Sequence, residues 1–444
     1  MKLNRRNFIQ KTSASVVGAG VFSILPSEIW NFPVAPSDKI RIGLIGCNSQ
    51  GFWDLKCHLE NNDAECVALC DVDSKVLNDR AAEIKKTYSQ NPVIYKDFRK
   101  MLEQKDIDAV IIGTPDHWHC LQLVYACQAG KDVYVEKPMA NSIAECNIMV
   151  KASNYYKRIV QVGQQQRSGF VFQESMKMIK DGTIGKLRKV NVWGNFNYGT
   201  GSDPVADSAV PEGVDYDMWL GPAPLRPFNR NRFHGSWRHY WDYGGGLMSD
   251  WGVHLLDMGL WAKDLVEAPS RVLTYAANSS TEKKVRDTFD TMTVSFPKKD
   301  YVINWDMTAG VQQGPYEKLY GLAFIGEKGT IVTDRNSYQV FPEWDDEKKA
   351  VKTEAKSFKN GKESHAEHAR NFLDCIKSRK TPACPPELGR VAALHAHIPN
   401  ICARTGEPVL LWDDINGRFT NSEKANALIK PEYRAPWKFP VIST

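Results

Sequence analysis

The chain has 444 residues, a formal net charge of +5 and 42% hydrophobic residues. This length allows two domains with sizeable cores. Residues 1–37 carry four basic and one acidic side chain, so the rest of the chain has a net charge of +2. A nearly neutral chain of this size gives no electrostatic basis for nucleic-acid binding, and we expect no nucleic-acid partner.

The N-terminus carries a paired arginine, Arg5 and Arg6, followed by a mildly apolar run over residues 13–25. The run is shorter than the about 20 apolar residues of a membrane-spanning helix, so we expect no stable membrane span. The pattern resembles a twin-arginine export signal with a Pro-rich linker behind it. We therefore predict that residues 1–37 direct export to the periplasm; the alternative is an uncleaved basic tail with a short apolar anchor.

A glycine-containing turn follows the predicted strand over residues 40–45 and opens a predicted helix. Asp71 ends a second predicted strand 20 residues beyond the turn. In dinucleotide-binding proteins such a turn places a helix N-terminus at the pyrophosphate, and the acid accepts the ribose hydroxyls. Asn48 replaces the usual second glycine, and asparagine tolerates a positive φ. The alternative is a βα turn that binds no phosphate. We predict dinucleotide binding by Gly46, Asn48, Ser49, Gln50, Gly51 and Asp71.

Strands and helices are predicted to alternate through residues 38–160. The strands are residues 40–45, a segment ending at 71, 93–95, 108–113, 132–136 and 159–162, and the helices are 73–87, 97–103, 117–129 and 142–156. This alternation implies an α/β domain with a doubly wound parallel (Rossmann) sheet, whose ligands bind at the carboxyl ends of the strands. Thr114 and Pro115 are expected to line the cofactor, and Glu136 to contact its nicotinamide ribose; the alternative is that they are ordinary turn residues.

Asp71 also bears on the choice of cofactor. A carboxylate accepts hydrogen bonds from both ribose hydroxyls of NAD and repels the 2′-phosphate of NADP. The next two residues are Val72 and Asp73, so no arginine follows to recruit that phosphate. We predict NAD rather than NADP. Because free NAD is scarce outside the cytoplasm, an exported enzyme is expected to bind it tightly.

Several motifs in this order and spacing resemble the oxidoreductase family typified by glucose-fructose oxidoreductase and inositol dehydrogenase, from about residue 38 onwards. They are the glycine turn, Thr114-Pro115 with His119, Glu136-Lys137-Pro138, and Asp250-Trp251-Gly252-Val253-His254. Trp219-Leu220-Gly221-Pro222-Ala223-Pro224 and Gly244-Gly245-Gly246 are similar to an exported bacterial subgroup. The resemblance implies that residues 161–444 form an α/β substrate domain with a large open mixed sheet. It also implies that this sheet packs against another subunit, in a homodimer or homotetramer.

The proposed chemistry uses Lys137, Asp250 and His254, which match the catalytic positions of that family. Oxidation of a secondary alcohol requires a side chain that accepts the hydroxyl proton, and histidine suits this role. Asp250 and His254 are four residues apart in a helix predicted over residues 250–262, so the carboxylate can orient the imidazole. The Lys137 ammonium can stabilise a developing alkoxide. Pro138 restricts the backbone at Lys137, and the resemblance admits a cis bond between them.

Each of these three residues has a simpler interpretation. Lys137 is then a strand-end lysine in solvent, Asp250 a helix N-terminal acid favoured by the helix dipole, and His254 a hydrogen-bonded core histidine. Asp257 also lies within reach of His254, so spacing alone leaves the partner of that histidine open.

Substrate candidates lie in the predicted second domain. Residues 164–167 follow the sixth predicted strand, and the loop over residues 197–241 is long, aromatic and polar. Such side chains suit a carbohydrate, and an arginine-rich loop equally suits a carboxylate such as a uronic acid. Alternatively, most of the aromatics pack the loop itself. We predict cofactor contacts from His119, Lys137 and Gln164, and substrate contacts from Lys137, Gln166, Arg167, Trp237, Arg238, Tyr240, Asp250 and His254.

The cysteines and histidines point to neither disulfides nor a metal. None of the ten cysteines forms a Cys-x-x-Cys pair, and a protein that folds in the reducing cytoplasm needs no disulfides, so we expect buried free thiols. Three histidine pairs lack partners at zinc-site spacing, and we predict no metal site. The pairs are His117/His119, His365/His368 and His395/His397.

Three functions compete. The first is NAD-dependent oxidation of a secondary hydroxyl in a sugar, glycoside or cyclitol. The second uses the same residues for transient oxidation, which acidifies the neighbouring C–H so that elimination cleaves a glycosidic bond and NAD is recycled in place. The third is a non-catalytic sugar-binding sensor, which the intact Lys137, Asp250 and His254 argue against.

Overall fold

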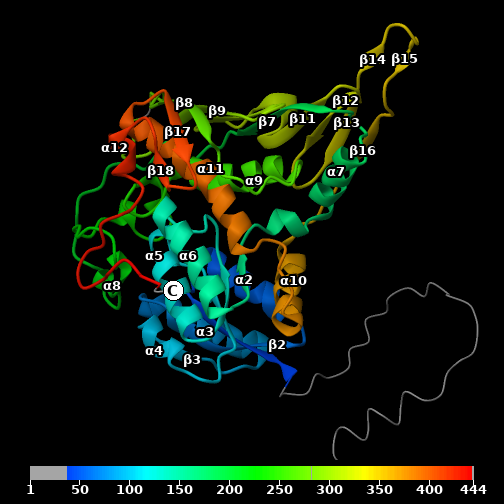
Figure 1. The fold of residues 1–444 in the computed structure, drawn as a ribbon. Coiled ribbons are helices and arrows are strands. Elements are labelled where there is room, and N and C mark those ends of the chain that lie inside the picture. Colours follow the sequence, from blue (N-terminus) through cyan, green and yellow to red (C-terminus); the bar gives the residue numbers. More distant parts are fainter. Residues whose placement is uncertain (1–37, 282, 443–444) are drawn as a thin grey trace, which may run out of the picture.

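The computed structural model describes residues 38–281 and 283–442. The predicted export signal in residues 1–37 lies outside the described residues. The described chain forms two domains, one on a parallel and one on a mixed sheet, joined by helices between them (Figure 1). This confirms the predicted fold class.

The first domain is a six-stranded parallel sheet in the order β3-β2-β1-β4-β5-β6. Its inner strands are buried along their length, as expected when helices cover both faces. The strands are β1 (Ile40–Ile45), β2 (Ala64–Cys70), β3 (Val93–Tyr95), β4 (Ala109–Ile112), β5 (Asp132–Val135) and β6 (Val160–Val162). The helices are α2 (Ser49–Leu59), α3 (Ser74–Tyr88), α4 (Phe98–Leu102), α5 (Asp116–Gln128) and α6 (Ile143–Tyr156).

The second domain is a ten-stranded mixed sheet in the order β16-β13-β12-β11-β7-β10-β9-β8-β17-β18. Only the β7–β10 pair is parallel among the described pairs of this sheet. The strands are β7 (Leu187–Gly194), β8 (Arg271–Ala277), β9 (Thr291–Pro297), β10 (Val302–Thr308), β11 (Tyr320–Gly326), β12 (Gly329–Thr333), β13 (Tyr338–Pro342), β16 (Lys356–Phe358), β17 (Val409–Asp413) and β18 (Arg418–Phe419).

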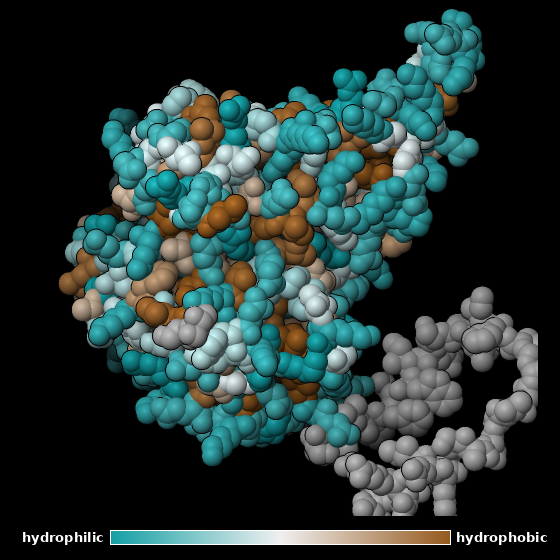
Figure 2. All heavy atoms as spheres, viewed as in Figure 1, coloured by the Kyte–Doolittle hydropathy of each residue, from teal (hydrophilic) through white to brown (hydrophobic). Residues whose placement is uncertain are grey.

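Helices cover the face of this sheet that looks toward the first domain (Figure 1). They are α7 (Phe170–Lys180), α9 (Val253–Trp261) and α11 (Pro386–Thr405). The other face is mixed: Thr293 bonds Asp306 and Ser295 bonds Asn304 across the strands, and a small separate apolar cluster is formed by Trp193, Ala323 and Val332. The remaining elements are α8 (Tyr216–Leu220), α10 (His365–Ser378), α12 (Glu423–Asn426) and the hairpin β14 (Trp344–Asp345) and β15 (Ala350–Val351). That hairpin projects from the body and is mainly hydrophilic (Figure 2).

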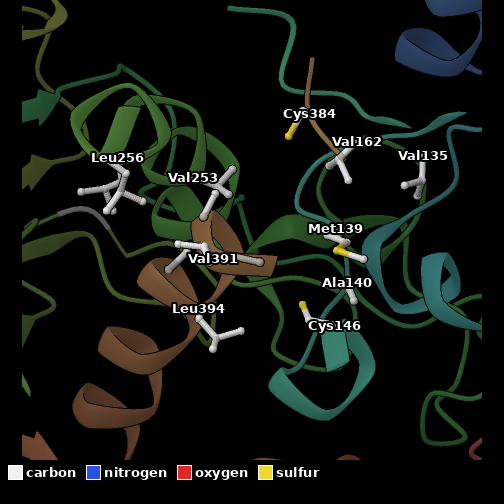
Figure 3. Close-up of a cluster of buried hydrophobic side chains, with 14 of the residues drawn as sticks. Val135, Met139, Ala140, Cys146, Val162, Val253, Leu256, Cys384, Val391 and Leu394 are labelled. Carbon is white, nitrogen blue, oxygen red and sulfur yellow. The ribbon is translucent and has the colours of Figure 1, made fainter. Parts of the chain in front are cut away.

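A continuous apolar core joins the two domains. Val253 and Leu256 of α9 and Val391 and Leu394 of α11 pack near Met139, which follows the Lys137-Pro138 bond (Figure 3). Helix α10 also returns from the second domain to pack against α2. This core fixes the end of β5 relative to α9, and so sets the distance between their side chains.

All ten cysteines lie in the described part of the chain, and all are buried free thiols, as predicted. No helix among the described residues is long and apolar enough to cross a membrane.

Candidate active site

The glycine turn closes tightly on the neighbouring strand ends. Gly46 has a φ of +85°, and a Cβ there would lie 2.7 Å from the backbone nitrogen of Thr114. A Cβ on Gly51 would lie 2.2 Å from the carbonyl oxygen of Gly46. The turn therefore requires glycine at both ends, and Gly51 serves the close packing of α2 on β1 rather than lining the site.

Asn48 does not use the positive φ that its residue type allowed. It has a φ of −92°, and its side-chain oxygen accepts from the backbone N–H of Ser49 at 2.9 Å. The positive φ falls instead on Ser49, at +43°. Asn48 caps α2, and a capping residue keeps an extended backbone.

A cleft with about 1110 Å³ of space runs along the carboxyl ends of β1, β2, β4 and β5. One wall is the first domain, and the other is a segment of the second domain, residues 213–238, which we call the strap. Of the predicted site residues, the cleft is lined by Gly46, Asn48, Ser49, Gln50, Asp71, Thr114, Pro115, Glu136, Lys137, Trp237 and Arg238.

Asp71 stands at one end of this cleft, at the end of β2. Its Oδ2 accepts from the backbone N–H of Cys47 at 2.7 Å, and its Oδ1 accepts from Asp73 N–H at 2.9 Å. These two bonds lock the carboxylate against the glycine turn. Burial raises the pKa of Asp71 despite both bonds. The arrangement matches an acid positioned to accept the hydroxyls of a ribose.

Lys137 and Asp250 form the centre of the site, where the two domains meet. Lys137 Nζ lies 2.6 Å from Asp250 Oδ1 and 3.1 Å from the Asp250 carbonyl oxygen. Arg238 Nε lies 3.1 Å from the same Oδ1, and the Tyr198 hydroxyl donates to Oδ2 at 3.2 Å. Burial opposes ionisation of Asp250, but Lys137 and Arg238 outweigh it and hold its pKa well below the ordinary range. Asp250 is therefore a fixed anion. The peptide bond between Lys137 and Pro138 is cis, as the family resemblance admitted.

The predicted pairing of Asp250 with His254 was wrong. Asp250 lies in a π-helical turn, Met248–Gly252, and α9 begins only at Val253, so the two side chains do not share a regular helix face. His254 Nδ1 instead contacts Gln164 Oε1 at 3.0 Å. Asp257, the other candidate partner, is bound elsewhere, because both its oxygens accept from Arg167.

Gln164 fixes the state of His254. The Gln164 amide nitrogen donates to the Val253 carbonyl at 3.3 Å, which turns its oxygen toward the imidazole. An amide oxygen can only accept a hydrogen bond, so His254 Nδ1 carries the proton and His254 Nε2 is left as an acceptor. Burial, with Lys137 close by, lowers the pKa of His254 well below its ordinary value. His254 is thus a neutral base beside the Lys137–Asp250 pair.

Glu136 faces a second buried carboxyl beneath the cleft. Its Oε1 accepts from Gln165 Nε2 at 2.7 Å. Asp54 of α2 lies beside it, and burial followed by the charge of Glu136 raises the pKa of Asp54 well above the ordinary value. Burial also raises the pKa of Glu136. Two carboxyls this close to each other favour sharing one proton.

Two residues predicted to contact the cofactor, His119 and Gln164, hold the backbone and side chains around the cleft. His119 contacts the carbonyl oxygens of Pro138 and Thr114, each at 2.9 Å. Burial lowers the pKa of His119 to about 4, so its neutral ring donates to one carbonyl at a time. Gln164 is engaged by Val253 and His254. Neither side chain lines the cleft, and direct contact of His119 or Gln164 with the cofactor stays a prediction.

Three predicted substrate contacts also have other roles. Arg167 is buried in its ion pair with Asp257. Gln166 is buried, and with its amide nitrogen toward the His254 carbonyl its oxygen accepts from Arg335 Nε at 2.9 Å. Tyr240 belongs to the aromatic cluster of the strap region. Each was chosen for its place in the sequence, and each is held by a partner that the sequence does not reveal.

Family models match nearly all of the described chain. "Oxidoreductase family, NAD-binding Rossmann fold" matches residues 40–164, and "Oxidoreductase family, C-terminal alpha/beta domain" matches residues 169–439. The chain belongs to this oxidoreductase family. The resemblance inferred from the motifs is confirmed, and the first domain is an NAD-binding Rossmann domain. Membership of an exported subgroup stays a prediction.

Curated relatives match a smaller part of the chain. A glycosyl hydrolase family 109 protein from Shewanella baltica (strain OS185) is 29% identical over 206 residues, which cover 42% of this chain and 44% of that protein. An alpha-N-acetylgalactosaminidase from Shewanella oneidensis is 27% identical over 205 residues, with 42% and 44% covered. The matched region thus spans less than half the length of these relatives.

Solved structures share the fold over most of the chain. An aldose-aldose oxidoreductase from Caulobacter crescentus, complexed with glycerol, has a TM-score of 0.63 at 17% identity and covers 84% of this chain and 100% of its own. The WlbA dehydrogenase from Bordetella pertussis, in complex with NADH and UDP-GlcNAcA, has a TM-score of 0.60 at 21% identity and covers 84% and 99%. At these identities the likeness shows the fold of the family.

The strap supplies the parts of the site that the family motifs do not mark. Its rings form an aromatic cluster with Tyr240 and Tyr243, which follow it in the chain, and the Trp219 carbonyl contacts His117 and Trp118 of the first domain. His234 lines the cleft from this side, and so does Met218. Asp116, the first residue of α5, is a further lining carboxyl, and burial raises its pKa well above the ordinary value. Only the aromatic composition of the loop signalled its role in the sequence.

Of the six histidines in the pairs noted in the sequence, all but His365 contact backbone carbonyls. His368 Nε2 lies 3.1 Å from the Val162 carbonyl, and His397 Nε2 lies 2.9 Å from that of Ala140. Within residues 38–281 and 283–442, no group of three or more His, Cys, Asp or Glu side chains is placed to hold a metal ion.

Proposed function

We propose that this member of the family oxidises a secondary hydroxyl of a sugar, glycoside or cyclitol, with NAD as the bound hydride acceptor. The observation that carries the proposal is the Lys137–Asp250 pair. It places a cationic proton donor, held at 2.6 Å by a buried anion, at the inner end of the cleft.

The residues of the first domain fit NAD. Gly46 and Gly51 allow the tight turn, α2 begins at that turn, and Asp71 lies where the ribose hydroxyls belong. The Asp71 carboxylate also disfavours the 2′-phosphate of NADP. When bound, NAD accepts a hydride from the substrate carbon.

The protein side of the reaction is the movement of one proton. The Lys137 ammonium hydrogen-bonds the reacting oxygen and stabilises negative charge that develops on it. Asp250 keeps that ammonium in place, since both of its oxygens are fixed by Lys137, Arg238 and Tyr198. His254, with Nε2 as an acceptor, is the neutral base into which the proton can pass. In this scheme Asp250 positions the Lys137 ammonium and does not orient the His254 imidazole.

A sugar is favoured by what surrounds this pair. A second cavity of about 510 Å³ adjoins it, lined by Tyr198, Gly235, Arg238, His239, Gly246, Leu247 and Asp250. Hydroxyl, imidazole and guanidinium groups there suit the hydroxyl edges of a sugar. The likeness in fold to an aldose-aldose oxidoreductase supports the same class.

Glycoside cleavage with in-place recycling of NAD is the second candidate. The match to family 109 glycosyl hydrolases, over 42% of this chain, favours it. The same Lys137–Asp250 pair serves both reactions, and they differ only in whether elimination follows the oxidation. Export through residues 1–37 and assembly into a homodimer or homotetramer stay predictions.

One experiment separates these functions. The purified protein is analysed for bound nucleotide, then mixed with a panel of glycosides, free sugars and uronic acids while the absorbance of reduced nicotinamide is followed. Lasting reduction supports the dehydrogenase, and bond cleavage without net reduction supports the recycling reaction. Failure to bind NAD, with no response to any of the panel, would refute both.

A further inference from the structure

The strap is joined to the first domain directly behind β2. The backbone N–H of Ser74 donates to the Gly213 carbonyl at 2.9 Å, and that of Asp215 donates to the Val72 carbonyl at 2.9 Å. Asp73 and Val214 form an isolated bridge between these two bonds. The strap therefore starts at the ribose-binding acid and crosses the cleft from there.

His234 closes the strap over the glycine turn. Its Nε2 lies 2.9 Å from Asp73 Oδ2, and its Nδ1 lies 3.3 Å from the Asn48 amide nitrogen. One imidazole thus joins two residues of the first domain, one in the glycine turn and one beyond Asp71. Its partners are 161 and 186 residues away in the chain, so these contacts tie the strap to the first domain across the cleft.

The hydrogen bonds suit a neutral ring. The Asn48 amide donates to Nδ1, so Nδ1 is an acceptor and the proton sits on Nε2, where the Asp73 carboxylate accepts it. Both ring nitrogens are then satisfied. Asp73 Oδ1 is separately engaged in capping α3 through Lys75 N–H. The α3 cap therefore fixes the Asp73 carboxylate, with Oδ2 facing His234.

The backbone at His234 is held in an unfavourable region. Its φ is +55°, in the left-handed region that few residues other than glycine adopt. Such conformations persist where surrounding contacts impose them, and they are common at ligand clamps. His234 is followed by Gly235, at which a Cβ would meet no atom within 4 Å. The segment after the histidine thus has room to move while the histidine itself is fixed.

We propose that His234 is a latch that retains the dinucleotide: NAD enters and leaves only when the His234 contacts to Asp73 and Asn48 open. The inference rests on NAD binding from the proposed function and adds the residue that controls its exchange. The first-domain wall of the cleft is continuous with the sheet. The facing wall is anchored at Gly213, Asp215 and Trp219, and the part of it over the glycine turn is held to the first domain by the two His234 contacts. An enzyme that recycles its cofactor in place needs such retention.

The test measures cofactor release without any substrate. Full-length protein loaded with NADH is mixed with excess NAD, and the loss of bound-NADH fluorescence gives the dissociation rate. We expect His234→Ala to raise this rate about tenfold or more, because two hydrogen bonds are lost. Asp73→Asn retains the α3 cap, since asparagine is a good capping residue, and should raise the rate as well.

Controls keep the result specific. Arg226→Ala removes an exposed ion pair with Asp242 elsewhere in the loop region and should leave the rate at the wild-type value. In the double variant of His234 and Asp73 the two effects should be less than additive, because both changes break one contact.

Wild-type dissociation rates in both single variants would overturn the latch and leave the proposed oxidation intact. If the wild-type protein binds no NADH, the proposed cofactor fails and the latch with it, and that outcome is seen before any variant is compared. A sugar panel without a reactive substrate would affect the proposed function only.

Discussion

The two walls of the cleft are built in different ways. The first-domain wall consists of strand ends and a turn whose shape is set by backbone atoms, as the 2.2 Å approach at Gly51 shows. The strap has little regular structure. Two backbone hydrogen bonds join its start to the first domain, and beyond them it is held by side chains, through an aromatic cluster and through His234. A wall built from backbone can be inferred from local sequence, whereas a wall built from side-chain contacts between distant segments cannot. The variants below separate the two kinds of wall.

The largest effect is expected at Lys137, where the walls meet. Lys137→Ala removes the cation from the reacting oxygen and should lower kcat/KM by about 10²–10³-fold, the usual loss for one such donor. Asp250 keeps Arg238 and Tyr198 as partners, so the variant should fold and still bind NADH. Steady-state kinetics on the substrate found in the panel, with NADH titration, measures both quantities.

The matched control is Lys100→Ala, which removes an exposed lysine of α4 paired only with Glu103 in the described structure. Its kinetics should match the wild type. Undiminished activity in Lys137→Ala would remove Lys137 from the reaction and leave His254 as the proton-handling group.

Two glycine substitutions compare the walls directly. Gly51→Ala forces a backbone shift at the turn and should destabilise the protein by about 3 kcal/mol, the upper end for overpacking. Gly235→Ala adds a methyl group where nothing lies within 4 Å and should change stability by under about 0.5 kcal/mol. Urea unfolding measures both. Equal effects would show that the two walls are equally rigid.

The sequence was informative where the structure is local. The apolar run at β4 and the spacing from Gly51 to Asp71 were enough to predict the Rossmann sheet, since parallel strands are buried on both faces. The second sheet came from family resemblance. The site was harder, because the partners of Asp250, His254 and Arg167 depend on a π-helical turn and on contacts across domains. Sequence spacing suggested that Asp250 pairs with His254, whereas packing pairs it with Lys137.

The first domain also carries a side-chain contact that should make stability depend on pH. Glu145 of α6 is buried, accepts from the Tyr433 hydroxyl at 2.6 Å and from Ser142, and burial raises its pKa from 4.5 to about 7. The folded state therefore binds this proton more tightly than the unfolded state. Its contribution is fully present below pH 4.5 and is lost as pH rises through 7, by roughly 3 kcal/mol at pH 8.

Glu145→Gln keeps the shape of the side chain and removes the titration. The variant should be more stable than the wild type at pH 8, and the difference should shrink toward pH 5, as measured by urea unfolding at both values. Glu103→Gln, at an exposed carboxyl of α4, is the control and should show no such trend. A stability difference that stays constant with pH would place the Glu145 titration outside this range.

The smallest effect concerns the cofactor preference that Asp71 sets. Asp71→Asn keeps an oxygen for the glycine turn but removes the charge, so the Kd for NADP should fall relative to that for NAD by about tenfold, or about 1.4 kcal/mol. The ratio of the two dissociation constants is the useful readout, because damage to the turn weakens the binding of both cofactors and cancels in the ratio.

The same preference should depend on pH. Since burial raises the pKa of Asp71, lowering the pH should protonate the wild-type carboxyl and reduce the preference of the protein for NAD over NADP. The asparagine variant should show no such narrowing. A preference that is unchanged by both substitution and pH would mean that the strap, rather than the end of β2, selects the cofactor.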